Sequence, residues 1–180
     1  MKEEGRKIVF WSGGNDSTLL ALRLLREREY VHLVSFVSYH IGGFAQQNKE
    51  KIYRKYLLHK FKEDFGDSFK YTEISWEAVL TNGQQHHLWC ALAPTILQSK
   101  DELYFGFLKY DDVWHKIEKF KQSILTTTDF FGLEEIKLEF PLEWMQKSAV
   151  RKELKKYGYL DNTIISNDSI ETEWVKAHNL

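Results

Sequence analysis

The segment VFWSGGNDSTLLALRLL (Val9–Leu25) leads from an apolar strand through two adjacent glycines directly into a leucine-rich helix. The glycines allow the backbone to turn where side chains would obstruct it. Asp16, Ser17 or Thr18 can cap the helix, and leucines at helical spacing supply its buried face. Such a turn gathers free backbone N–H groups at the positive end of a helix, where phosphate binds well. An ordinary tight turn between strand and helix would use the same glycines.

Length and composition indicate one globular domain. The chain has 180 residues, of which 43% are hydrophobic, enough for a core. Its net charge of −1 gives no overall attraction to nucleic acid or to an anionic membrane. No apolar run approaches the ~20 residues of a membrane span, and the first residues do not lead into a signal peptide. We therefore expect a cytoplasmic protein with a single domain over residues 1–180.

The potential metal ligands are few. The single cysteine, Cys90, excludes an internal disulfide and a zinc site built on several thiolates, and its apolar surroundings favour a small buried residue. The histidines could form a replacement metal site, although a bare histidine pair is more often structural. They are His40, His86, His87 and His115. We expect no zinc.

Apolar runs typical of strands alternate with helical patterns along the whole chain. The predicted strands are Lys7–Trp11, His32–Ser38, Phe69–Ile74, Leu103–Phe107 and Ile136–Phe140. The predicted helices are Asp16–Glu29, Gln46–Asp64, Gln84–Gln98, Asp112–Ile124 and Lys147–Tyr157. This alternation predicts βαβ units and a parallel sheet, whose ligands bind beyond the carboxyl ends of the strands. We expect the ligand at the loops that follow the first, second and fourth strands. These loops are Ser12–Ser17, Ser38–Gln47 and Lys109–Trp114.

The glycine loop matches neither of two widespread nucleotide motifs. The sequence has no G-x-x-x-x-G-K-[ST] and no G-x-G-x-x-G. The motif S-G-G-x-D-S that it does contain resembles the signature of the PP-loop ATP pyrophosphatases. The resemblance implies an α/β fold with a five-stranded, parallel, doubly wound sheet and helices on both faces. It also implies cleavage of ATP between the α- and β-phosphates, adenylation of a substrate oxygen and release of pyrophosphate.

The same resemblance suggests roles for individual residues. ATP would be held by Ser12, Gly13, Gly14, Asn15, Asp16, Ser17 and Thr18, largely through backbone N–H groups and hydroxyls. Asp16 repels phosphate, so its expected role is to hold Mg²⁺, with helix capping as the alternative. The base would lie against the backbone of Phe36, Val37 and Ser38. Gly106 either lets ligand approach its strand closely or marks a bulge or packing gap.

A second stretch, PLEWMQKSAVRKELKKYGYLDN (Pro141–Asn162), narrows the resemblance. Its pattern P-L-x-W-[ML]-x-K, followed by G-x-L-D, is similar to the 7-cyano-7-deazaguanine synthases of queuosine precursor synthesis. The likeness implies that Lys147 places a catalytic ammonium over the phosphates. The alternative is a surface lysine, which a helix start disfavours because the dipole repels cations.

This part of the chain also departs from that family. Its members carry four zinc-binding cysteines near the C-terminus, which are absent here, and an acid stands where this chain has Ala149. We therefore expect either an ATP- and Mg²⁺-dependent, AMP-forming ligase for a small 7-deazaguanine-type acceptor, or a regulatory nucleotide-binding protein. A homodimer and an ammonia-supplying partner remain open. The basic run Arg151–Lys156 is interpreted as a solvated helix face, with no strong nucleic-acid signal.

Overall fold

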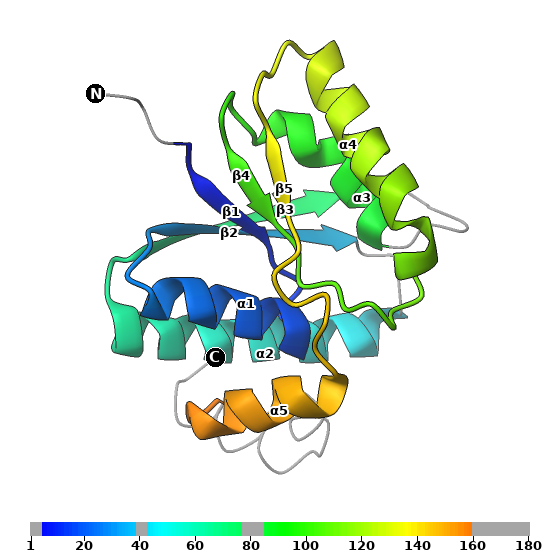
Figure 1. Ribbon diagram of the computed structural model, residues 1–180. Coiled ribbons are helices and arrows are strands. Elements are labelled where there is room, and N and C mark those ends of the chain that lie inside the picture. The colour runs from blue at the N-terminus through cyan, green and yellow to red at the C-terminus, as the bar shows by residue number, and fades with distance from the viewer. Residues whose placement is uncertain (1–4, 39–42, 77–84, 160–180) are drawn as a thin grey trace.

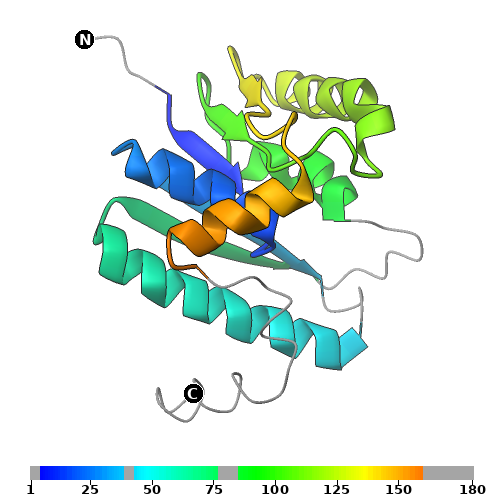
Figure 2. The ribbon, with the colours of Figure 1, turned by 60° about the horizontal axis from the view of Figure 1, so that its bottom comes forward.

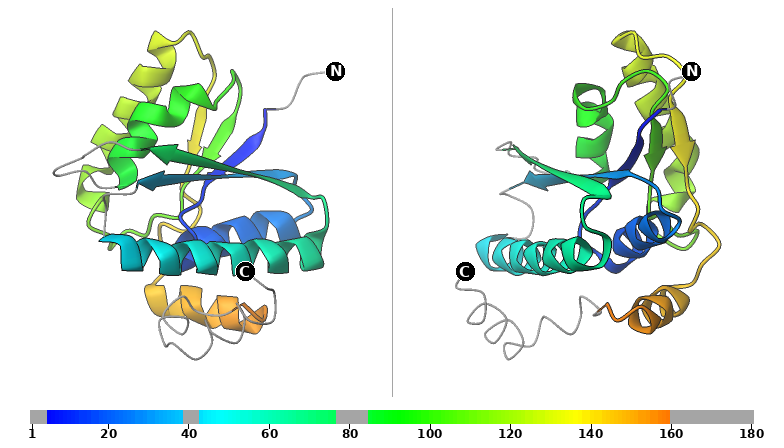
Figure 3. Two further views of the ribbon diagram at one scale, coloured as in Figure 1. Left: turned by 180° about the vertical axis from the view of Figure 1, so that it is seen from behind. Right: turned by 90° about the vertical axis from the view of Figure 1, so that its left-hand side faces the viewer.

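The computed structural model describes residues 5–38, 43–76 and 85–159. Five strands form one parallel sheet in the order β3-β2-β1-β4-β5. The strands are β1 (Lys7–Phe10), β2 (Val31–Ser38), β3 (Phe69–Trp76), β4 (Glu102–Tyr104) and β5 (Lys137–Glu139). This is the doubly wound α/β sheet that the sequence predicts, with helices on both faces (Figures 1 and 3).

Among the described residues, three helices lie on one side of the sheet and two on the other, and the outermost of the three packs on another helix rather than on the strands (Figures 1 and 3). The first set is α1 (Asn15–Arg26), α2 (Gly43–Phe65) and α5 (Lys147–Lys156). The second set is α3 (Gln85–Leu92) and α4 (Ile117–Phe130). The short 3-10 turn Ala93–Thr95 follows α3, and the 3-10 turn Trp114–Lys116 precedes α4. No helix among the described residues has both the length and the apolar character that a membrane crossing requires.

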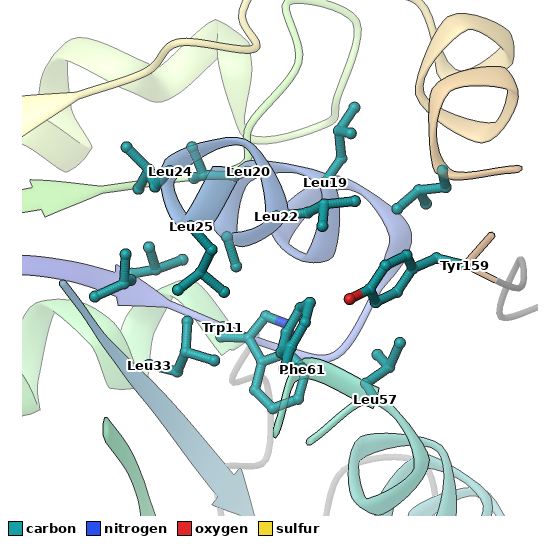
Figure 4. Close-up of a cluster of buried hydrophobic side chains, with 14 of the residues drawn as sticks. Trp11, Leu19, Leu20, Leu22, Leu24, Leu25, Leu33, Leu57, Phe61 and Tyr159 are labelled. Carbon is teal, nitrogen blue, oxygen red and sulfur yellow. The ribbon is translucent and has the colours of Figure 1, made fainter. Parts of the chain in front are cut away.

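The two faces of β1 begin two separate hydrophobic cores, because successive side chains of a strand point to opposite sides. Val9 of β1 and Trp11 just after the strand face α1, α2 and α5, whereas Ile8 and Phe10 face α3 and α4. Figure 4 shows the first core, in which Trp11 and Phe61 lie beneath the leucines of α1. Both rings are fully buried, so this core fixes the end of β1 and the helix that follows it.

The predicted bounds of the fourth strand and of two helices are wrong. The strand predicted as Leu103–Phe107 is Glu102–Tyr104, so Gly106 lies after it. The helix predicted to reach Gln98 ends at Leu92, because Pro94 lacks the N–H that would continue it. The helix predicted to begin at Asp112 begins at Ile117. A turn occupies the gap, since the N–H of Trp114 donates to the carbonyl of Asp111 at 2.9 Å.

The sheet has its topological switch point between β1 and β4, which are neighbours in space but not in sequence. In such sheets the crevice beyond the carboxyl ends of these strands is where ligands bind. The loop after β1 and the segment after β4 both start there. The fold therefore brings Ser12–Ser17 next to Phe105–Trp114.

Candidate functional site

The loop between β1 and α1 has two glycines with different conformational demands. Gly13 has φ +82°, a left-handed conformation that favours glycine. Gly14 has φ −71° and is the N-cap of α1, with no side-chain capping bond. The expectation that Asp16, Ser17 or Thr18 caps this helix is therefore wrong, because all three already lie inside α1.

Hydroxyl groups hold the loop in place. The Oγ atoms of Ser12 and Ser17 are 3.0 Å apart, and the Ser12 N–H donates to Ser17 Oγ at 3.2 Å. The Gly14 N–H donates to Ser12 Oγ at 3.1 Å. Thr18 is buried and accepts the indole N–H of Trp11 at 3.1 Å, while its own N–H donates to the Gly14 carbonyl. Thr18 thus fastens the loop to the core.

Four charged side chains from three segments surround the start of α1. Lys147, the first residue of α5, lies with its Nζ 3.1 Å from Asp111 Oδ1. Burial first, and then the charge of Asp111, raise the pKa of Asp16 to about 6, while Lys147 and Arg151 act to lower it. The structure therefore brings together the two predicted catalytic residues, Asp16 and Lys147.

Asp111 and Arg151 were not singled out from the sequence. The sequence signal that could have found Asp111 is its position in the loop Lys109–Trp114. This loop follows the fourth predicted strand and is one of the three loops in which a ligand is expected. Asp111 Oδ2 accepts the Leu108 N–H at 2.9 Å, which fixes the carboxylate so that its other oxygen meets Lys147. Arg151 lies one turn beyond Lys147 on α5.

A cavity of about 350 Å³ opens beside this cluster. Aromatic and imidazole rings form one part of its wall, and carboxylates and an ammonium form another. The lining residues are His86, Trp89, Phe107, Tyr110, Asp111, Asp112, Val113 and Lys147. Flat apolar surfaces next to a few charged groups are typical of small-molecule sites. The cavity can therefore take a planar polar ring next to Lys147.

The residues predicted to meet the base occupy the end of β2. The Phe36 ring is buried, and its centroid lies 4.9 Å from that of the Phe10 ring. Only the backbone of Phe36 is therefore available to contact a base. The pairing of β2 with β1 covers Val31 to Val34, and Phe36–Ser38 extend beyond it while pairing with β3. The part of β2 predicted to contact the base is thus unpaired with β1 on that side.

Gly106 lies against the start of α1. A Cβ at this position would stand 2.7 Å from the Ser17 N and 2.9 Å from the Asp16 carbonyl carbon. The glycine therefore lets the backbone of α1 approach the segment after β4. That close approach is what brings Asp16 to Asp111.

The donor set fits Mg²⁺. This ion prefers oxygen ligands and is commonly bound by one or two carboxylates together with phosphates and water. Asp16 and Asp111 supply two carboxylates close enough for the charge of one to raise the pKa of the other, a repulsion that a cation would relieve. In the described part of the chain, no group of three His, Cys, Asp or Glu side chains is placed to hold a metal.

Among the described residues, the histidines and cysteine considered for zinc form no metal-ligand group with these carboxylates, although His86 lines the same cavity as Asp111. The His86 and His87 rings are 4.3 Å apart on α3, and His115 is exposed in the turn before α4. His40 lies outside the described residues. Cys90 is half-buried, and burial raises the pKa of its thiol to about 11, so a thiolate is disfavoured there.

Replacing Asp16 by asparagine should stabilise the ligand-free protein at neutral pH. Because the folded state raises this pKa from 3.8 to about 6, the carboxylate destabilises the fold increasingly as pH rises between these values. After allowance for solvent screening, we expect Asp16→Asn to gain about 1–2 kcal/mol at pH 7.5. Urea unfolding without Mg²⁺ measures this gain, which should vanish near pH 4. An equal gain at both pH values would contradict the raised pKa.

Comparison with known proteins gives likeness in fold without likeness in sequence. No protein-family model and no curated protein matches the chain. The U34-tRNA thiolase NcsA from Methanococcus maripaludis, solved with its 4Fe-4S cluster, matches with a TM-score of 0.51 and 14% identity over 97% of this chain and 67% of that one. A predicted subunit of tRNA methyltransferase from Methanocaldococcus jannaschii gives 0.49 and 15%, over 87% of this chain and 89% of that one.

The likeness to the thiolase concerns the fold alone. Iron–sulfur clusters are held by several cysteine thiolates, and the 180 residues here contain one cysteine. The described chain therefore does not fit such a cluster, and its chemistry must be inferred from the site between β1 and β4. This chain has a five-stranded, doubly wound α/β fold, and the thiolase is similar to it in fold.

Proposed function

We propose that this chain is an ATP-dependent enzyme that adenylates a small-molecule acceptor and releases pyrophosphate, with residues 1–180 acting as one PP-loop ATP-binding domain. The observation that carries the proposal is the convergence of Asp16, Asp111 and Lys147 beside the S-G-G-N-D-S loop. A lysine and two carboxylates at a helix N-terminus are the groups that bind a metal-complexed triphosphate.

The reaction follows from where these charges lie. An acceptor oxygen attacks the α-phosphorus of ATP, the bond to the bridging oxygen of the β-phosphate breaks, and pyrophosphate leaves with the bonding electrons. Backbone N–H groups at the positive end of α1 would meet the departing charge. Lys147 would add a full positive charge to the same phosphates. Mg²⁺, held by Asp16 and Asp111, would neutralise the phosphates.

A 7-deazaguanine-type base is the acceptor we infer. The support is the likeness of Pro141–Asn162 to the nitrile synthases, together with the cavity beside Lys147. The Trp89 and Phe107 rings line the cavity, and Asp112 offers a carboxylate to the ring N–H groups of such a base. Amide or nitrile formation would also need ammonia, either free or supplied by a partner.

Ala149 supports a second candidate function. The related synthases have an acid at this position, two residues after the lysine. Ala149 is exposed in the first turn of α5, where it can bind neither a metal nor a proton. A protein that binds ATP for regulation without turnover would tolerate this loss.

Product analysis separates the two candidates. The protein is incubated with ATP, Mg²⁺ and a carboxylated 7-deazaguanine, with and without ammonium, and AMP and pyrophosphate are quantified. Equal amounts of AMP and pyrophosphate that depend on the acceptor support the enzyme. Tight ATP binding without AMP, under every acceptor tested, supports the regulatory protein. A mutant at Asp111 controls for contaminating ATPases.

Replacing Gly14 by valine should abolish ATP binding without unfolding the domain. The φ of −71° at Gly14 is open to any residue, and the nearest atom to a new Cβ is Ser12 Oγ at 3.2 Å. The valine would instead fill the space in which the loop N–H groups meet phosphate. Calorimetry should show affinity reduced at least about 100-fold, a loss near 3 kcal/mol. Unchanged affinity in a folded variant would refute this site.

The purified protein should contain no stoichiometric zinc. The cysteines that hold zinc in the related synthases are missing, and neutral histidines alone would have to replace them. Elemental analysis after mild chelation measures the content directly. About one zinc per chain would overturn this expectation, and loss of that zinc on replacing His86 would assign it to the histidines.

A further inference from the structure

The segment after β4 and the turn after β5 are joined into one rim beside the site. We define the site rim as residues 108–112 and 141–147. The Lys109 N–H donates to the Glu143 carbonyl at 2.7 Å, and Lys109 Nζ lies 4.0 Å from the centre of the Trp144 ring. The Asp111–Lys147 ion pair forms a third link. The rim is therefore held in place before any ligand arrives.

Two large aromatic rings of this rim face solvent. Trp144 is 70% exposed and Tyr110 is 77% exposed. Tyr110 lines the cavity, whereas Trp144 lies outside its lining. Because the Trp144 indole is exposed, it does not contribute to the core. Its contact with Lys109 keeps the ring in place as a flat surface. A ligand that reached from the cavity to Trp144 would extend beyond one small molecule.

A strip of positive charge leads away from the rim along α5. We define the basic strip as Arg151, Lys152, Lys155 and Lys156, all of them exposed. With Lys147, the ten-residue helix carries five basic residues and one glutamate, a net charge of +4 in a chain of −1. The glutamate, Glu153, pairs with Arg23 of α1 at 2.7 Å.

The geometry of α5 gives the strip its exposure. Val150 and Leu154 face inward and are fully buried in the core shared with α1. The intervening basic residues consequently lie on the outer surface, and Figure 2 shows α5 lying along the outer side of α1. At 1.5 Å per residue, the helix extends about 15 Å from Lys147. The strip thus starts at the site itself.

We propose that the site rim and the basic strip bind a single-stranded polynucleotide. Its bases stack on Trp144 and Tyr110, its phosphates follow the strip, and one base at the rim reaches the cavity. Aromatic faces next to a track of cations are the two elements of single-strand binding, since each base has a π-face and each linkage has a negative charge. An acidic peptide would use the cations but leave the two rings without a partner.

Fluorescence anisotropy with a labelled 12-nucleotide oligouridylate, in the absence of ATP, tests the proposal. We expect affinity that falls steeply with salt. Trp144→Ala should weaken binding about 5- to 150-fold, the range that alanine replacement of a base-stacking ring produces. The double variant Lys152→Ala/Lys155→Ala should have a shallower slope of log affinity against log salt concentration. The change should correspond to the loss of about two phosphate contacts.

Matched controls come from α4 on the opposite face of the sheet. Phe130→Ala removes an 84% exposed ring, and Lys119→Ala removes an exposed charge. Both should bind like the unaltered protein. The proposal is overturned if Trp144→Ala binds as tightly as Phe130→Ala, if no binding occurs at 50 mM salt, or if oligoaspartate or anionic vesicles compete as well as the oligonucleotide. A deoxyuridylate strand that binds equally assigns the site to single strands in general, and weaker binding assigns it to RNA.

The result is independent of the proposed catalysis. Because the assay contains no ATP, absent AMP formation would leave it unchanged. Absent oligonucleotide binding would in turn leave the product analysis with a free acceptor intact. The two failures are thus distinguishable in one protein preparation.

Discussion

Replacing Lys147 by alanine, or Asp16 by asparagine, should slow AMP formation by about 10²-fold or more while weakening ATP binding much less. Negative charge grows on the leaving pyrophosphate, so a positive charge aimed at it stabilises the transition state more than bound ATP. In the proposed reaction, Asp16 would act on the same phosphates through Mg²⁺. Removal of one well-placed electrostatic group typically costs roughly 3 kcal/mol or more in rate. Single-turnover kinetics and calorimetry together separate rate from affinity.

The double variant Asp16→Asn/Lys147→Ala should lose less than the sum of the single losses, because both groups act on one ligand and share the neighbour Asp111. Lys119→Ala on α4 is the control for loss of a lysine as such. If Lys147 were an ordinary surface residue, its alanine variant would form AMP at the normal rate. Normal rates in either folded variant would favour the regulatory protein over the enzyme.

The sheet could be predicted because its signals are local. Strands and helices alternate with clear apolar patterns, and the S-G-G-x-D-S loop marks the end of the first strand. Helix ends were harder to place. Pro94 ends α3 early, and the Asp111 turn delays α4 to Ile117, since both effects depend on which hydrogen bonds the backbone finds in the fold.

The part of the candidate site that the sequence could name lies in continuous sequence motifs. Ser12–Ser17 and Lys147 could be named, because each lies in a recognisable pattern. Asp111 could not, because its importance comes from meeting Lys147 and Asp16 across 36 and 95 positions of sequence, counted from their residue numbers. The exposure of Trp144 and its contact with Lys109 depend on the same packing of two loops.

At Gly106 the sequence predicts the position of a close contact but not the group that makes it. The sequence indicates only that some close approach occurs at this position. The structure shows that the approaching group is the backbone of Asp16 and Ser17, at the beginning of α1. The packing of the segment after β4 against the start of α1 is therefore what sets the distance between the loop Ser12–Ser17 and Asp111.

Replacing Gly106 by alanine should both destabilise the fold and disable the site. The new Cβ would stand 2.7 Å from the Ser17 N, 2.8 Å from its Cα and 2.9 Å from the Asp16 carbonyl carbon. All three are backbone atoms, which cannot rotate away as a flexible side chain can, so α1 must move. Overpacking of this kind costs about 1–3 kcal/mol. We expect a loss near the upper end, measured by urea unfolding.

The displaced helix would also carry Asp16 and the loop N–H groups away from Asp111 and Lys147. A misplacement of about 1 Å can cost 10²-fold in rate, so AMP formation should fall even at temperatures where Gly106→Ala remains folded. Gly14→Ala is the matched control, because its Cβ would meet only Ser12 Oγ at 3.2 Å and its φ is ordinary. That variant should unfold within about 0.5 kcal/mol of the unaltered protein. Equal unfolding midpoints for the two alanine variants would mean that α1 does not depend on Gly106, and the packing argument for the placement of Asp16 would fail.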